Sequence, residues 1–575
     1  MVKLSVIIPT HGRAQNLREC LDSLFRQNHS LQDFEIIVVL DGSVDDSRSM
    51  LGALRAPLSL RILEQPKAGA AAARNRGATE AQGEICLFLD DDMIALPTLI
   101  SEHMELQRRV KAAVGFGQIV LESRKGASTF LSCRARSWQE HYAGLDQQDV
   151  SSDFTNCYGG HFSVPREAFL QVGGFDVNIA RNHDTELAFR LREHGLTFVY
   201  CSKAVTFQRD DKGFRELARD WEKRGEAEVK VYRKQPRMLP HLKLGNFGKL
   251  SVRETLLRRL LLACRVHPQI LSIPFLFLRN TRQQDAWYRF VINYCYWRGV
   301  RRSTAGREIW QRVVRGPVIL SYHALTSSGR AAQYVLPVRR FARQMAWLHR
   351  LGYTVIPLGN VLKQWRECQF PPARAVVITF DDGYEDACSL AAPILERHHF
   401  PATFFVVTGC IGETNPSSYN LEVADRPLLS WRDIRQLKQR GFYFGSHTRS
   451  HAALDSASAA ELDEELTGSL KDLEREFGCS NFPLAYPYGG QDAHAQAAAE
   501  RAGYSCALGM EPGINDPAVS RFSLRRTEIY GKDSLLQFAI GVWLGKLPPL
   551  ERARAVSRRV NPFRKSAVGV GKHGA

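Results

Sequence analysis

The sequence predicts an α/β chain with two separate α/β regions, and three observations support this prediction. Apolar runs of strand length alternate with helical patterns in the front third and again in the rear half of the chain. Two of these runs, residues 85–89 and 375–380, lead directly into adjacent aspartates. At 575 residues the chain is also longer than one hydrophobic core supports, so several domains are expected.

In the front third, continuous apolar runs predict strands that are buried on both faces of a parallel sheet. LSVIIP at residues 4–9 and EIIVVL at residues 35–40 are the first two strands. Helical spacing of leucines between them predicts a helix over residues 16–27. The strand at residues 85–89 ends in three acidic residues, and ligands bind at that edge of open α/β sheets.

Asp90, Asp91 and Asp92 form a cluster of like charges, which is costly unless a cation neutralises it. Hard cations such as Mg²⁺ and Mn²⁺ prefer such oxygen ligands and bridge a diphosphate. An acidic turn at a strand end is the simpler interpretation of DDD alone. The order of the surrounding motifs favours a binding site: PTHGR, LDGSVDDS, AAARNRGA and FLDDDM are followed by GGFDVNIARNHDTELAFRLR.

Through these motifs, residues 1–235 resemble the family-2 inverting glycosyltransferases, which have the Rossmann-like GT-A fold of nucleotide-diphospho-sugar transferases. The resemblance implies a nucleotide-sugar donor, which we expect to be UDP-linked. It also implies donor-binding residues, which are Thr10, Asp41, Arg74, Asp90 and Asp91.

The resemblance further assigns a metal site and a catalytic base. Asp92, or alternatively Asp90, would hold Mn²⁺ or Mg²⁺ on the diphosphate, where the metal stabilises the charge of the leaving group. Asp184 matches the position of the base, which takes the proton of the attacking acceptor hydroxyl. Three positions depart from the family pattern. Members of the family usually have acidic residues where Leu40 and His183 stand, and often a histidine where Gln208 stands.

The middle of the chain, residues 236–312, is basic, helical in pattern and rich in Leu, Trp and Tyr. LLRRLLLACR at residues 256–265 predicts an amphipathic helix that Pro268 ends. Two interpretations stay open: a helical bundle that packs on the front domain, or a peripheral helix at an anionic membrane surface.

The rear half contains a second α/β pattern. Strands are predicted at residues 317–323, 375–380 and 402–407, with a helix over residues 341–351. The strand at 375–380 delivers two aspartates, and SHTRSH carries two histidines four residues apart, which a helical turn would place on one side. Two histidines, one carboxylate and a water are a recognised catalytic zinc arrangement.

TFDDG, SHTRSH and YPYGG together make residues 313–545 resemble the NodB-type polysaccharide deacetylases, carbohydrate esterase family 4, with a distorted (β/α) barrel. The resemblance implies that Asp382, His447 and His451 bind Zn²⁺ or a similar divalent metal. It also assigns Asp381 as the general base that takes a proton from water.

Three further residues complete the expected deacetylase site. A backbone N–H near Tyr488 would stabilise the oxyanion, and Arg526 would orient Asp381. His323 is a candidate general acid, because the only histidine after His494 is His573 in the tail. Tyr486 stands where many members of the family carry arginine.

Composition and charge limit the cellular context. The net charge of +17 predicts contact with phosphate-rich partners, and an anionic membrane surface is one; no nucleic-acid-binding motif is recognisable. Twelve scattered cysteines without a CxxC pair fit a reducing compartment. We recognise no secretory signal and no apolar stretch of about 20 residues. We therefore expect a cytoplasmic protein, either free or peripheral at the inner face of the cell membrane. The basic tail, residues 546–575, is expected to be disordered.

The sequence thus predicts a bifunctional enzyme of surface polysaccharide or glycolipid biosynthesis. One domain would transfer a sugar to a glycan or lipid-linked glycan acceptor, and the other would remove N-acetyl groups from the same glycan. Two alternatives stay open: an impaired deacetylase-like domain that only binds glycan, and an esterase that acts on O-acetyl groups.

Overall fold

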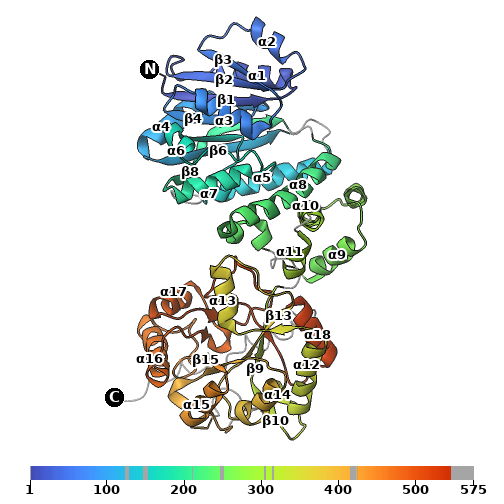
Figure 1. Ribbon diagram of the computed structural model, residues 1–575, viewed down its shortest axis with the longest axis vertical. Helices are drawn as coiled ribbons and strands as arrows, with labels where there is room; N and C mark the ends of the chain where they lie inside the picture. The colour runs from blue at the N-terminus through green and yellow to red at the C-terminus, as the bar shows by residue number, and fades with distance from the viewer. Residues whose placement is uncertain are drawn as a thin grey trace, which may run out of the picture. The chain divides into compact units, whose positions relative to one another are not determined.

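The computed structural model describes residues 2–122, 128–146, 153–209, 212–246, 252–303, 306–313, 316–414, 423 and 425–545 (Figure 1). These residues form two compact units. The first contains the described residues up to 238 together with 257–307, and the second contains 239–256 and the described residues from 308 onward. The tail at 546–575, which the sequence predicts to be disordered, lies outside the described residues.

The first unit is built on a mixed eight-stranded sheet of order β3-β2-β1-β4-β7-β6-β8-β5. Its strands are β1 (Leu4–Thr10), β2 (Phe34–Asp41), β3 (Leu60–Gln65), β4 (Ile85–Leu89), β5 (Met93–Ala95), β6 (Ala113–Glu122), β7 (His161–Pro165) and β8 (Thr197–Arg209). Strands β3, β2, β1 and β4 run parallel, and β7 runs antiparallel to both of its neighbours. Because β1 and β2 are buried along their whole lengths, their apolar runs do not alternate with polar residues.

Helices cover this sheet, and α3 packs on β1 and β2 while α5 packs on β6 (Figure 1). The helices are α1 (Ala14–Leu24), α2 (Ser47–Ala53), α3 (Ala70–Glu80), α4 (Leu99–Arg109), α5 (Thr129–Asp146), α6 (Arg166–Gln171), α7 (His183–Glu193) and α8 (Phe214–Lys234). The helix predicted over residues 16–27 is α1, shifted by a few residues toward the N-terminus.

The middle region contributes α9 (Val252–Ala263), the 3₁₀ helix η4 (Pro268–Leu276), α10 (Thr281–Arg302) and α11 (Gly306–Val313). The predicted helix at 256–265 already ends at Ala263, because Arg265 takes a left-handed φ of 52°, and Pro268 begins η4 instead of ending a helix. No helix among the described residues is long and apolar enough to cross a membrane.

Helix α10 packs closely against α8 within the first unit. Glycines on both helices permit this approach: a Cβ atom at Gly225 would lie 2.1 Å from the carbonyl oxygen of Tyr296, and one at Gly299 would lie 1.9 Å from that of Glu222. Larger residues at these positions would force the helices apart. This part of the middle region is therefore packed on the first unit.

The second unit is built on an all-parallel sheet of order β17-β16-β15-β14-β13-β9-β18, with β12 pairing beside β13. Its strands are β9 (Val318–Tyr322), β12 (Thr354–Val355), β13 (Ala375–Phe380), β14 (Thr403–Val406), β15 (Tyr443–Ser446), β16 (Leu484–Ala485), β17 (Ala507–Leu508) and β18 (Thr527–Glu528). A separate pair is formed by β10 (Ala324–Thr326) and β11 (Val335–Pro337).

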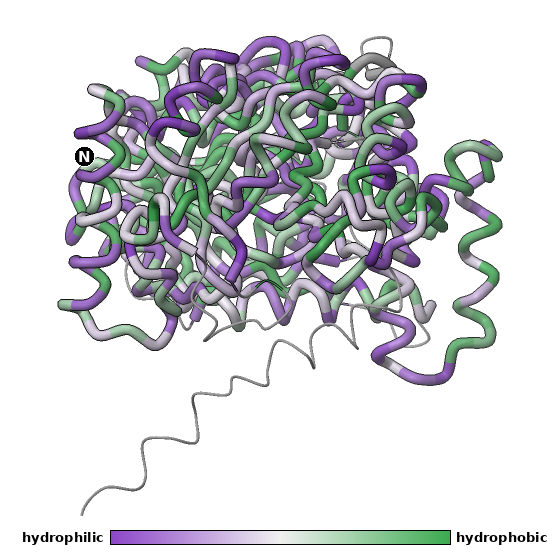
Figure 2. Tube along the Cα trace, turned by 90° about the horizontal axis from the view of Figure 1, so that it is seen from below, coloured by the Kyte–Doolittle hydropathy of each residue, from purple (hydrophilic) through white to green (hydrophobic). Residues whose placement is uncertain are grey.

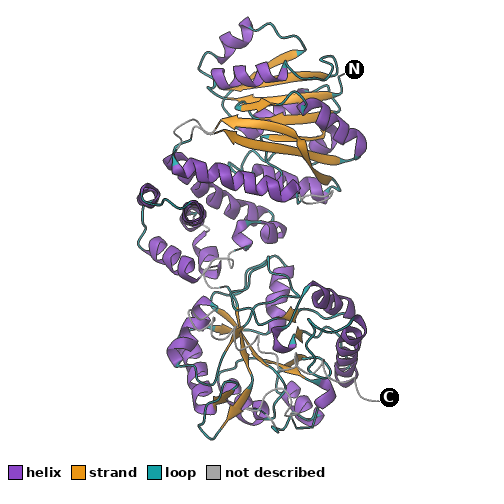
Figure 3. Ribbon diagram, turned by 180° about the vertical axis from the view of Figure 1, so that it is seen from behind, coloured by secondary structure: helices purple, strands orange, loops and turns teal. Residues whose placement is uncertain are grey.

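Helices surround this curled sheet (Figure 3), as crossover connections between parallel strands require. They are α12 (Val338–Arg350), α13 (Leu358–Arg366), α14 (Ala392–Arg397), α15 (Trp431–Gln439), α16 (Ala459–Phe477), α17 (Ala493–Ala502) and α18 (Leu535–Leu544). Helix α12 buries Phe341, Met345 and Leu348, the spacing of one helix face. In both units the hydrophobic stretches of the chain tend to lie inside (Figure 2), and both are α/β structures, as the sequence predicts.

Candidate functional site

The first candidate site lies at the carboxyl edge of neighbouring parallel strands in the first unit. Thr10 ends β1, Asp41 ends β2, and Asp90 follows β4. Because β2, β1 and β4 are adjacent and parallel, their ends meet at one edge of the sheet. The sequence prediction that this edge is acidic is therefore realised by side chains from several strands.

Asp41 is held as a buried anion by the loop that follows β3. Its Oδ1 accepts hydrogen bonds from the Ala68 amide at 2.7 Å and from Gln65 Nε2 at 2.9 Å, and its Oδ2 accepts from the Gly69 amide at 2.8 Å. Burial opposes ionisation, but these donors together lower the pKa of Asp41 below its usual value. Asp41 is thus a fixed acceptor at the edge of the sheet.

Arginines, a threonine and a glutamine hold the acidic cluster. Thr10 Oγ1 donates to Asp91 at 2.7 Å, and Arg13 Nη1 donates to both Asp91 and Asp92 at 3.1 Å. Arg74 donates to Asp90. Gln208 Nε2 donates to Asp92 Oδ1 at 3.1 Å, so it does lie in the site. Arg13 is a site residue that the sequence analysis missed, although it belongs to the PTHGR motif.

Burial and mutual repulsion disfavour the ionised form of the carboxylates in this cluster. Burial raises the pKa of Asp91 to about 6, against the opposing effects of Arg13 and Thr10. Burial, followed by the charge of Asp90, also raises the pKa of Asp92. Carboxylates that resist ionisation for these reasons are suited to a divalent cation, which would restore the ionised form. Carboxylate oxygens are the donors that Mg²⁺ and Mn²⁺ prefer, and the role of Asp92 as a metal ligand stays a prediction.

Asp184, the predicted base, lies in the first turn of α7, where the helix dipole favours an anion. Its Oδ2 accepts from the Gly159 amide at 3.1 Å. Burial would raise its pKa, but the positive charge of His183 and the amide donors lower it. Arg74 lies between the acidic cluster and the residue before Asp184: it donates to Asp90, and its Nη1 lies 3.1 Å from His183 Nε2. A Cβ atom at Gly160 would lie 2.6 Å from Asp90 Oδ2, so the glycine permits this close approach.

A buried chain of hydrogen bonds connects the α7 end that carries Asp184 to α10. Asn182 Nδ2 donates to Glu228 Oε1 on α8 at 2.8 Å, and Tyr296 on α10 donates to Glu228 Oε2 at 2.6 Å. Asn182 adopts a left-handed φ of 59° immediately before the helix. Periodicity gives no signal for such a chain, because its members are about 46 and 68 residues apart in sequence.

The second candidate site is a compact group in the second unit. Among the described residues, Asp382, His447 and His451 are the group of three potential metal ligands whose donor atoms all lie within 4.8 Å of one another. The Nε2 atoms of both histidines lie 3.3 Å from the same oxygen, Asp382 Oδ1. All three side chains are buried.

Surrounding contacts orient these histidines as metal ligands. His447 Nδ1 donates to the Ala485 carbonyl oxygen at 2.8 Å, which orients the ring so that Nε2 faces Asp382. Although burial opposes it, the two histidines hold the pKa of Asp382 well below its usual value. Two imidazole nitrogens and one ionised carboxylate fit a tetrahedral zinc site with one open position.

The expectation that His447 and His451 share a helical turn is wrong. They lie in the loop after β15, where Thr448 and His451 both adopt a φ of 65°. Asp382 and Tyr488 also have left-handed φ values, of 69° and 58°. Such conformations are unfavourable for residues other than glycine, so the surrounding contacts must hold them in place.

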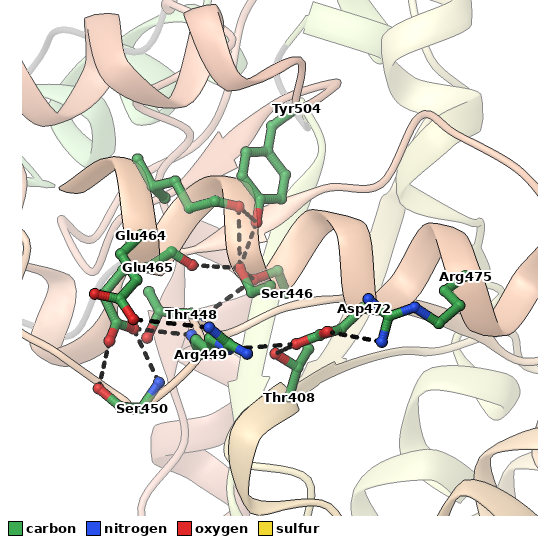
Figure 4. A network of polar contacts seen from close by, with 12 residues as sticks. Thr408, Ser446, Thr448, Arg449, Ser450, Glu464, Glu465, Asp472, Arg475 and Tyr504 are labelled. Carbon is green, nitrogen blue, oxygen red and sulfur yellow. Dashed lines mark hydrogen bonds and ion pairs between the residues drawn. The ribbon is translucent and has the colours of Figure 1, made fainter. Parts of the chain in front are cut away.

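Helix α16 supplies many of these contacts (Figure 4). Glu465 Oε2 accepts from the amides of Arg449 and Ser450, each at 2.9 Å. Ser446 Oγ donates to Ser469 on the same helix at 2.9 Å and accepts from the Thr448 amide at 3.0 Å. The loop between the two metal-site histidines is thus fixed from one side by a single helix.

Asp381, the predicted base of the second site, is fully enclosed and paired with Arg526. Arg526 Nη1 donates to Asp381 Oδ1 at 2.7 Å, and Ser321 Oγ donates to Oδ2 at 3.2 Å. Burial would raise the pKa of Asp381, but Arg526 and neighbouring histidines lower it. Arg526 Nε donates to the Gly509 carbonyl at 2.9 Å, which fixes the guanidinium plane.

The other predicted residues lie around this group. Tyr488 is about half exposed at 54%, and its hydroxyl lies 3.2 Å from His451 Nδ1. His323 lies close enough for its positive charge to lower the pKa of Asp381 and Asp382, and its ring packs on Tyr334. Tyr486 is buried and donates to the Phe522 carbonyl at 3.0 Å.

Comparisons with known proteins match a family model to part of each unit. Residues 5–173 match the model of the family described as Glycosyl transferase family 2, and residues 369–507 match the family described as Polysaccharide deacetylase. A protein of Bacillus subtilis named "Putative polysaccharide deacetylase YxkH" is 28% identical to this chain over 211 residues. The match covers 37% of this chain and 70% of the relative.

Two further proteins are similar to the rear of the chain. The poly-beta-1,6-N-acetyl-D-glucosamine N-deacetylase of Staphylococcus aureus is 28% identical over 229 residues, covering 38% of this chain and 76% of the relative. The solved structure of the deacetylase PplD of Streptococcus pyogenes, in complex with acetate, shares 25% identity over 39% of this chain and 97% of that chain, with a TM-score of 0.35.

The chain thus combines domains that match two families of carbohydrate-active enzymes. The chain carries a family-2 glycosyltransferase domain followed by a polysaccharide deacetylase domain. The fold class predicted from the sequence, a GT-A domain joined to a NodB-type deacetylase domain, is confirmed.

Proposed function

We propose that the chain is a bifunctional enzyme of surface polysaccharide or glycolipid biosynthesis, which transfers a sugar and removes N-acetyl groups from the glycan. The observation that supports this most directly is the buried group of Asp382, His447 and His451, with Asp381 paired beside it. The acidic strand edge of the first unit gives further support. We further propose domain limits of 1–235 and 313–545, with 236–312 as a helical extension.

In the proposed transfer reaction, the donor is a nucleotide sugar, which we take to be UDP-linked. Thr10, Asp41, Arg74, Asp90 and Asp91 bind the donor, and Asp92 holds the metal. A Mn²⁺ or Mg²⁺ ion would supply positive charge to the diphosphate leaving group. Asp184, ionised because its pKa is lowered, accepts the proton of the acceptor hydroxyl as that oxygen attacks with inversion.

In the proposed deacetylation, Asp381 is the proton acceptor and Arg526 holds it ionised and oriented. Asp382, His447 and His451 would hold Zn²⁺ or a similar metal, which would act as a Lewis acid toward water and the acetyl carbonyl. The backbone near Tyr488 offers an N–H to the oxyanion. His323 is our candidate donor of the proton that the leaving amine needs.

The fusion of two domains supports a shared substrate, because tethering raises the effective concentration of one site near the product of the other. A relative at 28% identity is named for deacetylation of poly-beta-1,6-N-acetyl-D-glucosamine. By that similarity we propose that the substrate of the rear domain is an N-acetylated hexosamine glycan. A free amine produced there would add positive charge to the glycan.

We propose that both reactions take place in the cytoplasm, where nucleotide sugars are formed, and at the inner face of the cell membrane. Deacetylation would then precede export of the glycan. The partners are a nucleotide-sugar donor, a glycan or lipid-linked glycan acceptor and an anionic membrane surface, and we assign no nucleic-acid partner. The positive net charge of the chain supports such a location.

Mass spectrometry of the products tests this function. The full chain would be given UDP-N-acetylhexosamines, Mn²⁺, Zn²⁺ and a bacterial lipid and oligosaccharide extract. A product that gains a hexosamine without its acetyl group supports both activities. A product that gains and keeps N-acetylhexosamine supports a transferase joined to an impaired glycan-binding domain, and matched ester and amide substrates distinguish an O-acetyl esterase.

Two variants separate the sites. Asp382→Ala should abolish deacetylation and leave sugar transfer unchanged, because Asp382 belongs to the group of metal ligands in the second unit and not to the transferase site. Asp184→Asn should abolish transfer and leave deacetylation unchanged. Loss of both activities from either change, with the fold intact by circular dichroism, would contradict the two-site proposal.

A further inference from the structure

An apolar surface is exposed on the middle region of the chain. Along η4 the exposed fractions are 55% for Ile270, 50% for Ile273 and 81% for Leu276. Phe277, which follows η4, is 76% exposed, and Leu260 on α9 is 60% exposed. Single exposed apolar residues are ordinary, but five on or next to two consecutive elements mark a contact surface. We name these five residues the η4 surface.

The η4 surface is held in place by the opposite side of the same segment. Leu271 and Phe275 are buried, and the Phe275 ring contacts Phe130 on α5 at 5.4 Å between centroids. Trp287 Nε1 on α10 donates to the Leu271 carbonyl at 2.9 Å. Because these contacts already anchor the inner face of η4, the outward apolar side chains are not needed for folding and remain available to a partner.

Positive charge flanks η4 along the chain. Arg265, Arg279 and Arg282 are all exposed. Residues 252–282 contain six arginines and one acidic residue, Glu254. Apolar side chains that enter the acyl boundary, flanked by arginines that reach phosphate headgroups, are the pattern of peripheral attachment to an anionic bilayer. A protein partner would need acidic residues around an apolar pocket instead.

We propose that the η4 surface inserts into the interface of a bilayer that contains anionic lipids. The η4 surface would thus supply the residues that attach the chain to a membrane. The purpose of the attachment rests on the proposed function: it would bring the transferase domain to a lipid-linked acceptor. Attachment itself depends on the apolar and basic residues and on neither catalytic site.

Flotation of the full chain with vesicles tests the proposal. Vesicles of phosphatidylglycerol and phosphatidylcholine should bind the protein, and those of phosphatidylcholine alone should bind it at least about tenfold more weakly. The double variant Leu276→Asp and Phe277→Asp should lose binding about tenfold or more. The matched control is Leu536→Asp, because Leu536 is 70% exposed on α18 in the second unit.

The proposal is overturned if the wild type does not bind anionic vesicles, or if the double variant binds as the wild type does. Binding that falls equally in the Leu536→Asp control would also contradict it. Sugar transfer to a water-soluble acceptor should be the same in the double variant and the wild type. If neither protein transfers sugar but the wild type still binds anionic vesicles, the proposed function is refuted and the membrane proposal stands.

A different observation supports a second inference, on the deacetylase site. Glu465 is the side chain that receives the backbone amides of Arg449 and Ser450, which lie between the two metal-site histidines (Figure 4). Its neighbour Glu464 is 73% exposed and lies 3.7 Å from Arg449 Nη1, at the surface. One helix therefore carries two adjacent glutamates, of which one holds the loop.

We infer that Glu465 is a positioning residue that keeps the His447 to His451 loop in the shape required for metal binding. The loop contains left-handed residues, Thr448 and His451, so it needs acceptors for its amides to remain in that conformation. An ionised carboxylate that accepts two amides is a strong acceptor of this kind. The inference rests on the proposed binding of a divalent metal at Asp382, His447 and His451.

Zinc affinity, measured by competition with a chromophoric chelator, tests this role. Glu465→Leu removes the acceptor of the Arg449 and Ser450 amides, and zinc should bind about 10- to 100-fold more weakly, as for other outer contacts of metal ligands. Glu464→Leu should bind zinc as the wild type does. Equal affinities in all three proteins would overturn the inference, whereas a wild type without zinc affinity would instead refute the proposed metal site.

Discussion

Arg526 and Asp381 form a buried ion pair, in which Arg526 Nη1 lies 2.7 Å from Asp381 Oδ1. The exposed fractions of the two side chains are 0% and 3%. Both groups are satisfied further, Asp381 by Ser321 and Arg526 by the Gly509 carbonyl. A buried pair of this kind is costly to break, because the remaining charge has no water to solvate it. The pair also determines the protonation state of the proposed base.

Replacement of Arg526 by methionine should therefore lower both stability and activity. The uncompensated carboxylate should cost about 3–5 kcal/mol in the free energy of unfolding, measured with urea. Arg521→Met is the control, because Arg521 pairs with Glu500 at the surface, with both side chains 56% exposed, and should cost less than about 1 kcal/mol. Equal losses in the two variants would contradict the role of Arg526.

The pH dependence of deacetylation should also change in the Arg526→Met variant. In the wild type the pKa of Asp381 is lowered, so the pair stabilises the fold above the ordinary carboxyl value of about 3.9 and loses this effect as the pH falls through the lowered pKa. Without Arg526 the pKa of Asp381 rises, and the acid limb of the kcat/KM profile should move to higher pH. An unchanged acid limb would show that Asp381 is not the base.

Asp91→Asn should stabilise the ligand-free chain at pH 7.5 and prevent donor binding. Because burial raises the pKa of Asp91 to about 6, stability is lost as the pH rises from about 4 through 6. Asparagine removes this penalty, which is at most about 3 kcal/mol. The gain in thermal midpoint should shrink as the pH is lowered to 5, and a gain that is constant with pH would argue against this cause.

Gly160→Ala should reduce sugar transfer without a general loss of structure. The added Cβ would lie 2.6 Å from Asp90 Oδ2 and 3.1 Å from Met93 Cε, so Asp90 must move away from Arg74. We expect kcat/KM for the donor to fall about 100-fold, as misplacement by about 1 Å can cause. The control is Gly144→Ala in α5, where the added carbon meets nothing within 4 Å and transfer should be unaffected.

Tyr296→Phe should slow transfer although Tyr296 belongs to the middle region. The change removes the hydrogen bond to Glu228, which in turn accepts from Asn182 at the start of the helix that carries Asp184. We expect kcat to fall several-fold while KM for the donor stays the same, since the donor-binding residues are on other elements. Deacetylation by the same protein serves as the internal control, and an equal fall in that activity would indicate a general loss of stability.

Much of both sites could be predicted from local sequence. Asp90 to Asp92 and Asp381 with Asp382 each follow an uninterrupted apolar run, and parallel strands bring such strand ends to one edge. The pairing of Arg526 with Asp381 could be expected only through resemblance to a family, because 145 residues separate them. The helical turn expected for His447 and His451 is wrong, because spacing alone does not reveal the left-handed residues of a loop.

The sequence by itself determined the two α/β regions, their order and the strand-end carboxylates, because burial on both faces of a strand and the alternation with helices are local properties of the chain. Only the tertiary structure decided which distant residues hold those carboxylates and histidines: Arg13 on the acidic cluster, Glu228 behind Asp184, and Glu465 on the metal-site loop. The physical reason is that such contacts form between side chains far apart in the chain, and they exist only once packing has brought the elements together.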